Sequence, residues 1–218
     1  MHVDLGEVLR FVYSPRMSFH KYLCAASLCS FVALVSGLMV VSEVRAGSLV
    51  DHADDLPVAA SVDPSTLEQA SAFAGNYQFV GGQKERDAVD AAIETSVDAL
   101  SPLLRNIGRS RLVESNVVPK NLSIRVEGNT IEALFDGEGF AAGLDGTPVR
   151  ATNKDGEKVK VSYKLRGGKL SELIDNDKGD RQNTFKLSDD GKTLTVKVTV
   201  SSSHLPVPVD YKLTFKKK

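Results

Sequence analysis

The sequence predicts a mainly β protein: an antiparallel meander of about eight or nine strands, closed into a barrel or stacked as a sandwich, with one N-terminal helical pair. Apolar residues alternate with polar ones over most of the chain after Pro119, as in strands with one buried face. Turn pairs such as Gly128-Asn129 and Gly167-Gly168 separate these segments. The connections are too short for parallel crossovers, so neighbouring strands are antiparallel.

The helical pair follows directly after a short first strand. Tyr77 and Phe79 alternate with polar neighbours, and Gly81-Gly82 ends this strand. From Gln83 the apolar residues recur every three or four positions, at Val89, Ile93, Val97, Leu100, Leu104 and Ile107. Pro102 interrupts this stripe, because an interior proline removes a hydrogen bond and clashes with the preceding turn. The pattern predicts a helical hairpin at 83–113, with helices over about 83–99 and 102–113.

Further strands are predicted wherever the apolar period is two. They cover residues 122–126, 131–135, 149–152, 159–165, 170–174, 185–187, 194–200 and 209–215. The glycine-rich segment 136–143 is interpreted as a connection between strands. A meander of this size has exposed edges unless it closes or stacks, which leaves both the barrel and the sandwich open.

The N-terminal segment has the pattern of a secretory signal. Basic residues precede an uncharged apolar run at 23–41, and a small-residue site ends at Ala46. We interpret 1–46 as a signal peptide, with Met17 as an alternative start that leaves 1–16 untranslated. The run is also long enough to span a bilayer, so an uncleaved membrane anchor is the alternative. The signal predicts export to a periplasmic or extracellular location.

The remaining chain divides into a flexible acidic arm at 47–72 and an antiparallel β domain at 73–218. Residues 47–218 contain no cysteine, so the domain is stabilised by its core and not by disulfides. They carry 23 basic and 25 acidic side chains, mixed along the chain. This balance argues against nucleic acid as a partner, because phosphate recognition needs an excess of positive charge.

No motif predicts catalysis, a metal or a cofactor. His204 lies beside Ser201, Ser202 and Ser203 and six residues before Asp210, but adjacent residues of an extended segment point to opposite faces. A zinc site needs cysteines or paired histidines, and residues 47–218 contain neither. The segment 175–180, DNDKGD, does not match the calcium-loop pattern and is interpreted as a solvated hairpin turn. We expect a protein that is not an enzyme.

The layout resembles that of a known group of barrels. A first strand beginning with Gly75 and Tyr77, then two short helices, then a meander of hairpins is similar to the calycin group, which includes lipocalins and fatty-acid-binding proteins. The resemblance implies that the helical pair lies over the barrel as a lid. The chain departs from the ligand motifs of the group: it has no Trp at the first strand, and Tyr211 is not preceded by the expected arginine.

The function predicted from this resemblance is non-catalytic binding of a small apolar or amphipathic molecule. Its lining is predicted to include Phe135, Tyr163, Val198 and Tyr211. A second set of residues, Arg105, Arg109 and Arg111, is a candidate contact for an anion or a lipid headgroup, or else balances a helix dipole. The alternative is a structural or interaction protein of the cell envelope, with a filled core, no ligand and an envelope protein as its partner.

Overall fold

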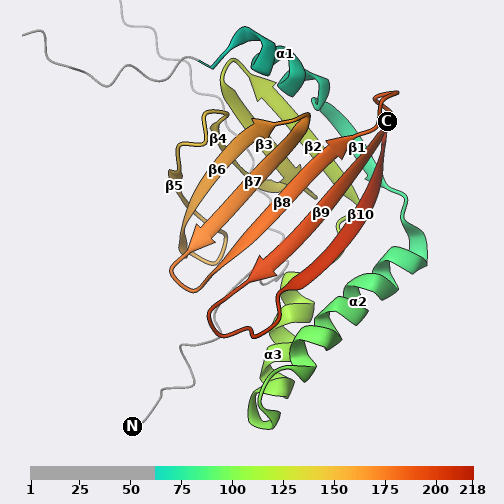
Figure 1. The fold of residues 1–218 in the computed structure, drawn as a ribbon, viewed down its shortest axis with the longest axis vertical. Coiled ribbons are helices and arrows are strands. Elements are labelled where there is room, and N and C mark those ends of the chain that lie inside the picture. Colours follow the sequence, from blue (N-terminus) through green and yellow to red (C-terminus); the bar gives the residue numbers. More distant parts are fainter. Residues whose placement is uncertain (1–61) are drawn as a thin grey trace, which may run out of the picture. The chain divides into compact units, whose positions relative to one another are not determined.

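A single antiparallel sheet of ten strands forms the domain in the computed structural model, which describes residues 62–218 (Figure 1). The sheet order is β4-β3-β2-β1-β10-β9-β8-β7-β6-β5. An isolated bridge joins Asp145, beyond β4, to Lys164 of β6, so the two ends of the sheet come together as a nearly closed barrel. This confirms the predicted fold class and selects the barrel. The strands are β1 Gly75–Phe79, β2 Asn121–Glu127, β3 Thr130–Phe135, β4 Glu138–Gly143, β5 Val149–Thr152, β6 Lys158–Arg166, β7 Lys169–Asn176, β8 Gly179–Leu187, β9 Thr193–Ser201 and β10 Val209–Lys217.

The interpretation of 136–143 as a connection was wrong, because most of this segment is β4. Phe135 pairs with Glu138, so Asp136 and Gly137 form a two-residue hairpin loop. Their φ angles are 49° and 90°, and two positive φ angles are typical of the type I′ turn that joins twisted strands. The glycines and alanines of β4 have low strand propensity, which hid the strand from the periodicity.

Within residues 62–218, three helices accompany the barrel: α1 Pro64–Ala72, α2 Gly82–Asp98 and α3 Pro102–Ser115. The helical hairpin is therefore confirmed, with Pro102 at the start of α3. The segment 47–72 was predicted to be a flexible arm. Its last part differs from this prediction, because residues 64–72 form helix α1. Ala70 and the following Phe73 are buried in the core, and this burial holds the short helix in place. Residues 47–61, and the predicted signal at 1–46, lie outside the described residues.

Helix α2 covers an edge of the barrel that β1 leaves unpaired. β1 pairs with β10 only at residues 215–217, so the rest of β10 has no strand on that side among the described residues. α2 packs Val89, Ile93 and Val97 onto this region. At its first turn the Glu85 carboxylate accepts hydrogen bonds from the backbone N–H and the hydroxyl of Thr214, both at 2.6 Å. Glu85 thereby accepts from the backbone N–H of Thr214, which a neighbouring strand would otherwise bond at this edge.

Helix α3 does not continue the apolar stripe of α2 onto the barrel. Leu103 is 89% exposed and Ile107 is 45% exposed, although the sequence pattern placed Ile107 in the stripe. α3 packs on α2 at Gly108, where Leu100 lies so close that an added Cβ would be 2.5 Å from it. Because Pro102 starts a new helix, the phase of the α2 stripe is lost, and part of the apolar surface of α3 faces solvent.

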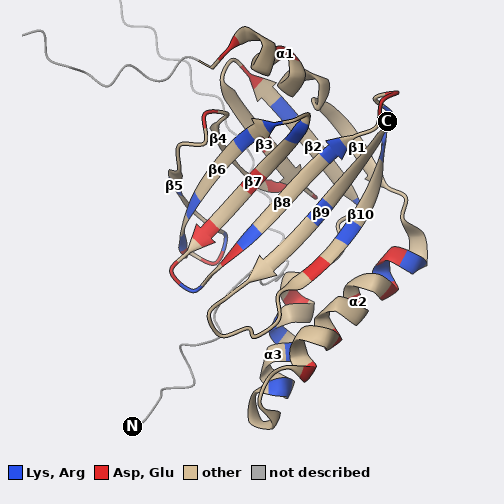
Figure 2. Ribbon diagram, viewed as in Figure 1, with Lys and Arg blue, Asp and Glu red and all other residues tan. Residues whose placement is uncertain are grey.

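Figure 1 places α1 at one end of the barrel and the α2–α3 pair at the other. Charged residues of both signs are spread over strands and helices alike (Figure 2). Within residues 62–218 no helix combines the length and apolar character needed to cross a bilayer.

We predict that Glu85→Ala lowers the free energy of unfolding by about 2 kcal/mol, since it removes two charge-assisted hydrogen bonds and leaves the Thr214 N–H unpaired. The matched control is Glu94→Ala on the same helix, which removes a solvent-exposed ion pair with Arg109 and should change stability little. Urea unfolding of both variants measures the difference. Equal stability of the two variants would contradict this account of how α2 docks.

Candidate functional site

A row of interior side chains crosses five neighbouring strands of the barrel. The strand registers place Tyr163 of β6, Glu172 of β7, Asn183 of β8, Val198 of β9 and Tyr211 of β10 side by side. All five side chains are buried, and the charged or polar members lie in an otherwise apolar core. We call these five residues the interior row.

Glu172 lies at the centre of a hydrogen-bonded chain within this row. Its Oε1 is 2.6 Å from the Tyr163 hydroxyl, and its Oε2 accepts a 2.7 Å hydrogen bond from Asn183 Nδ2. The Tyr163 hydroxyl also accepts from the Ala133 N–H at 3.1 Å and lies 2.9 Å from the Phe140 carbonyl. Tyr163 of β6 therefore reaches across the barrel to the β3–β4 hairpin.

These contacts limit where the protons lie. The Tyr163 hydroxyl has a single proton and lies within donating distance of two acceptors, Glu172 Oε1 at 2.6 Å and the Phe140 carbonyl at 2.9 Å. With Glu172 ionised, the phenol donates to Glu172 and gives no proton to Phe140. With Glu172 protonated, the carboxyl donates to the phenol, the phenol donates to Phe140, and Oε2 still accepts from Asn183. The geometry therefore accommodates a neutral carboxylic acid.

The electrostatics favour the protonated arrangement. Glu172 is 1% exposed, and burial raises the pKa of its carboxyl, although the hydrogen bonds that Tyr163 and Asn183 can donate to it and the charge of Arg181 lower that pKa. Burial likewise raises the pKa of the Tyr163 hydroxyl. Desolvation disfavours the charged form of an acid, and here it outweighs the stabilising contacts.

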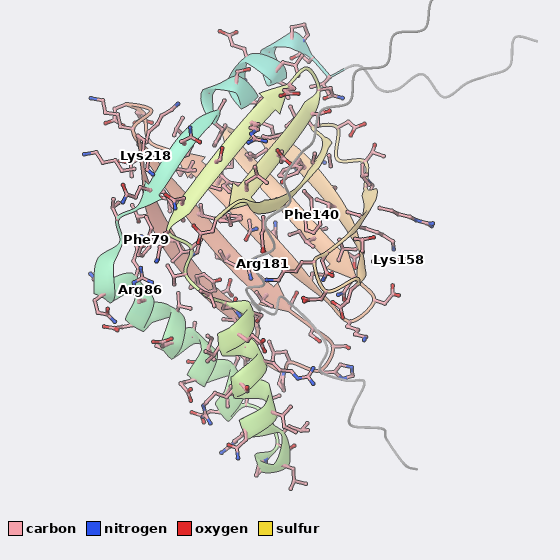
Figure 3. The ribbon with its side chains drawn as sticks, turned by 180° about the vertical axis from the view of Figure 1, so that it is seen from behind. Phe79, Arg86, Phe140, Lys158, Arg181 and Lys218 are labelled. Atoms are coloured by element: carbon pink, nitrogen blue, oxygen red, sulfur yellow. The ribbon has the colours of Figure 1, made fainter. Side chains whose placement is uncertain are left out.

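A second polar cluster lies one position further along the interior face. Arg181 of β8 is two residues from Asn183 and points to the same side of the strand. Its Nη1 donates to the carbonyl of Ser115 and to Oδ1 of Asn116, both at 3.3 Å, and its Nη2 donates to the Tyr211 hydroxyl at 3.0 Å. Figure 3, which labels Arg181, shows it at the end of the barrel nearest α3. We call Arg181, Tyr211, Ser115 and Asn116 the arginine cluster.

The arginine cluster connects the helical pair to the barrel interior. Ser115 is the last residue of α3 and Asn116 is its C-cap, and both are buried. The Asn116 amide donates to the Leu112 carbonyl at 2.8 Å, and its Oδ1 also accepts from the Tyr211 hydroxyl at 3.0 Å. The end of α3 is thus held over this end of the barrel by neutral acceptors bonded to one guanidinium.

Arg181 has no acidic partner in the described part of the chain: none of the ion pairs formed within it includes this residue. All three of its hydrogen-bond acceptors are uncharged, and the Glu172 carboxyl, whose pKa the charge of Arg181 lowers, forms no ion pair with it. The direct partners of this half-buried guanidinium are therefore dipoles. Carboxylate and phosphate oxygens are the acceptors whose charge and planar geometry fit this group best.

The structure brings the four predicted lining residues onto the interior face. Tyr163, Val198 and Tyr211 belong to the interior row, and Phe135 stacks on buried Phe185 with ring centroids 6.2 Å apart. Their contact with a ligand remains a prediction. The sequence pattern did not lead us to predict three of the polar site residues, Glu172, Asn183 and Arg181. Each of them occupies an inward position in the period-two alternation of β7 or β8. A polar residue at such a position is the signal that would have found them.

Two of the three arginines of α3, Arg105 and Arg109, have partners within the protein. Arg109 forms a bidentate ion pair with Glu94 of α2 at 2.7 and 2.6 Å, and this bond lowers the pKa of the Glu94 carboxyl. Arg105 donates to the carbonyls of Asp98 and Leu100 at the end of α2. These contacts tie α3 to α2. An anion or headgroup contact of Arg105, Arg109 and Arg111 remains a prediction.

The remaining polar motifs form turns. Asn176 Oδ1 accepts from the backbone N–H groups of Lys178 and Gly179, and Ser202 donates to the Lys178 carbonyl. These turns line a shallow, open polar hollow of about 300 Å³. Asp210 bonds to Thr199 and Lys197 on the outer face, away from any role with His204. Residues 62–218 contain no group of three or more His, Cys, Asp or Glu side chains placed to hold a metal ion.

The topology confirms the predicted calycin-like layout, because the first strand is followed by a helical pair and then by nine antiparallel strands.

No protein-family model and no curated protein sequence matches the chain. Solved structures that match include lipid binding protein 8 of Caenorhabditis elegans (15% identity, TM-score 0.44, covering 68% of this chain and 96% of that one). A Schistosoma mansoni fatty acid binding protein in complex with arachidonic acid also matches (18% identity, TM-score 0.40, covering 69% and 98%). A secretory abundant heat soluble protein of Ramazzottius varieornatus is a third match (16% identity, TM-score 0.44, covering 67% and 96%). Similarity at this level does not establish a shared ligand.

We predict that Glu172→Gln becomes progressively more stable than the wild type as the pH rises. The amide introduced by this substitution donates and accepts like the neutral acid. Because the folded pKa of Glu172 is raised above the ordinary 4.5, its contribution is complete below that pH and is lost as the pH rises through the folded pKa. Urea unfolding between pH 4 and 9 should show a difference near zero at pH 4 that grows by up to about 1.4 kcal/mol per pH unit. A difference that does not depend on pH would contradict the neutral acid.

Proposed function

We propose that this chain binds a small amphipathic molecule inside the barrel, with the anionic head of the molecule at Arg181. The observation that supports the proposal most strongly is the inward guanidinium that meets only neutral oxygens. A core that served packing alone would have little reason to hold such a group. Burying a charge is costly unless an opposite charge or strong hydrogen bonds compensate it.

The neutral state of Glu172 supports the same proposal. If Glu172 were ionised, it would supply the counter-charge for Arg181 within the barrel. Because burial raises the pKa of Glu172 and favours its neutral form, the interior keeps a net positive charge. A carboxylate or phosphate entering the barrel would meet this charge at a half-buried site, where electrostatic attraction is screened less than at the surface.

The arginine cluster also suggests how a ligand would be admitted. Ser115 and Asn116 bond to Arg181 at 3.3 Å, longer than a charge-assisted bond to a carboxylate. An anionic head would replace these two acceptors and leave the 3.0 Å bond from the Tyr211 hydroxyl to Asn116 as the remaining hydrogen bond of this cluster between α3 and the barrel, so the end of α3 would be held less firmly. The apolar tail would then lie along Phe140, which is half-buried on β4, and the neighbouring interior side chains. In this account the α2–α3 pair is a lid, and Arg181, the residue that binds the ligand, also holds the lid in place when no ligand is bound.

We also propose that the protein is exported. The order of basic residues, apolar run and small-residue site in 1–46 supports this. Mass spectrometry of protein recovered from the medium or periplasm of its host should show a chain that begins near Gly47. A full-length chain in the membrane fraction would indicate the anchor instead.

A second candidate function is protein interaction through α3. Four large apolar side chains on and just after this helix are exposed: Leu103, Ile107, Val113 and Val117. Exposed apolar groups on one element mark interaction surfaces. In this case the lid surface meets an envelope protein and the interior takes no ligand, so the binding experiment below separates the two functions.

We predict that Arg181→Gln weakens binding of hexadecanoate by about tenfold to a hundredfold, the range expected for one lost charge-assisted hydrogen-bonding group. Binding of the uncharged methyl ester of the same acid should stay within about twofold, because the ester makes no ion pair. Displacement of an environment-sensitive fluorescent probe measures both affinities.

The matched control is Arg125→Gln, which changes an arginine on the outer face that pairs with Glu132. It should bind both ligands as the wild type does. If the wild type binds neither ligand, the proposed function fails. If Arg181→Gln and Arg125→Gln bind the acid equally well, Arg181 is not the anion site.

A further inference from the structure

The interior row ends in a buried acceptor that has no donor. Asn183 is 1% exposed, and its Oδ1 has no hydrogen-bond partner in the part of the chain that the structure describes. Most buried polar atoms are hydrogen-bonded, because an unpaired buried acceptor costs free energy. This oxygen therefore requires an explanation that the packing of the core does not supply.

The hydrogen bond to Glu172 fixes which amide atom is left over. Oε2 of Glu172 accepts from Asn183 Nδ2 at 2.7 Å, both when the carboxyl is ionised and when its proton is on Oε1. Asn183 must then present its NH₂ group to Glu172. The amide is held in this orientation, and Oδ1 is directed away from the chain of hydrogen bonds.

The position of Asn183 relates this acceptor to the proposed anion site. Asn183 and Arg181 share the interior face of β8, two residues apart, which corresponds to about 7 Å along a strand. The next member of the row is Val198, which offers no donor. A guanidinium and an unpaired carbonyl oxygen thus face the same interior, one suited to an anion and the other to a hydrogen-bond donor.

Resting on the proposed function, we infer that Asn183 Oδ1 is a second recognition point, which accepts a hydrogen bond from a hydroxyl or N–H group on the apolar part of the ligand. The preferred ligand class is then an amphipathic anion that carries such a donor a short distance from its charged head, and not a plain fatty acid. The donor satisfies an oxygen that is otherwise unpaired, whereas a plain hydrocarbon chain leaves it so.

The test compares hexadecanoate with its monohydroxy isomers, each bearing one hydroxyl at a different carbon, on the full-length protein. At least one isomer should bind about tenfold more tightly than hexadecanoate, and isomers with the hydroxyl elsewhere should bind more weakly because they bury it unpaired. In Asn183→Leu, which is similar in size and lacks the acceptor, the ratio of the affinity for the preferred isomer to the affinity for hexadecanoate should fall to about one.

Circular dichroism verifies that Asn183→Leu is folded, and the isomer series on the wild type tests the inference without any variant. If hexadecanoate binds but no isomer binds more tightly, the inference is wrong and the proposed function stands. It is also wrong if Asn183→Leu keeps the preference. If neither hexadecanoate nor any isomer binds, the proposed function itself has failed.

Discussion

The Glu172 carboxyl is buried in the core and lies 2.6 Å from the Tyr163 hydroxyl, and burial raises the pKa of this carboxyl. The rest of the interior depends on this group. Glu172 orients the Asn183 amide through a 2.7 Å hydrogen bond, and as a neutral acid it leaves Arg181 without a counter-charge. The same phenol ties β6 to the β3–β4 hairpin across the barrel, where Ala133 donates to it. The Tyr163 side chain therefore contributes to barrel closure and contacts the carboxyl whose protonation sets the charge of the interior.

The helical pair has two separate attachments to the barrel. Glu85 bonds α2 to Thr214 at the edge that β1 leaves open, with short hydrogen bonds to a full charge. The end of α3 is held by longer bonds between Arg181 and neutral acceptors and by a neutral hydrogen bond from Tyr211 to Asn116. Because the second attachment is the weaker one, α3 is the element expected to move when a competing anion enters. The exposed apolar side chains of α3 would then lie on the moving element.

Much of the fold follows from patterns that are local in the sequence. The period-two segments and turn pairs predict nine of the ten strands, and Pro102 divides the two helices. Strand β4 was not predicted because its glycines and alanines give no apolar alternation. Helix α1 was not predicted because a short helix depends on the tertiary burial of Ala70 and Phe73. The lining residues were predicted from aromatic and apolar positions alone. Glu172, Asn183 and Arg181 meet only through strand register, which sequence periodicity does not provide.

The central claim is that the interior keeps the positive charge of Arg181 because Glu172 is neutral. Carbon-13 NMR of the glutamate carboxyl groups, with the Glu172 signal assigned by its loss in Glu172→Gln, measures this state during a pH titration. We expect the Glu172 carboxyl to remain protonated at pH 7, with a pKa well above 4.5, while the exposed glutamates titrate normally. A carboxyl that is ionised at pH 7 would give Arg181 its counter-charge inside the barrel and would contradict the account.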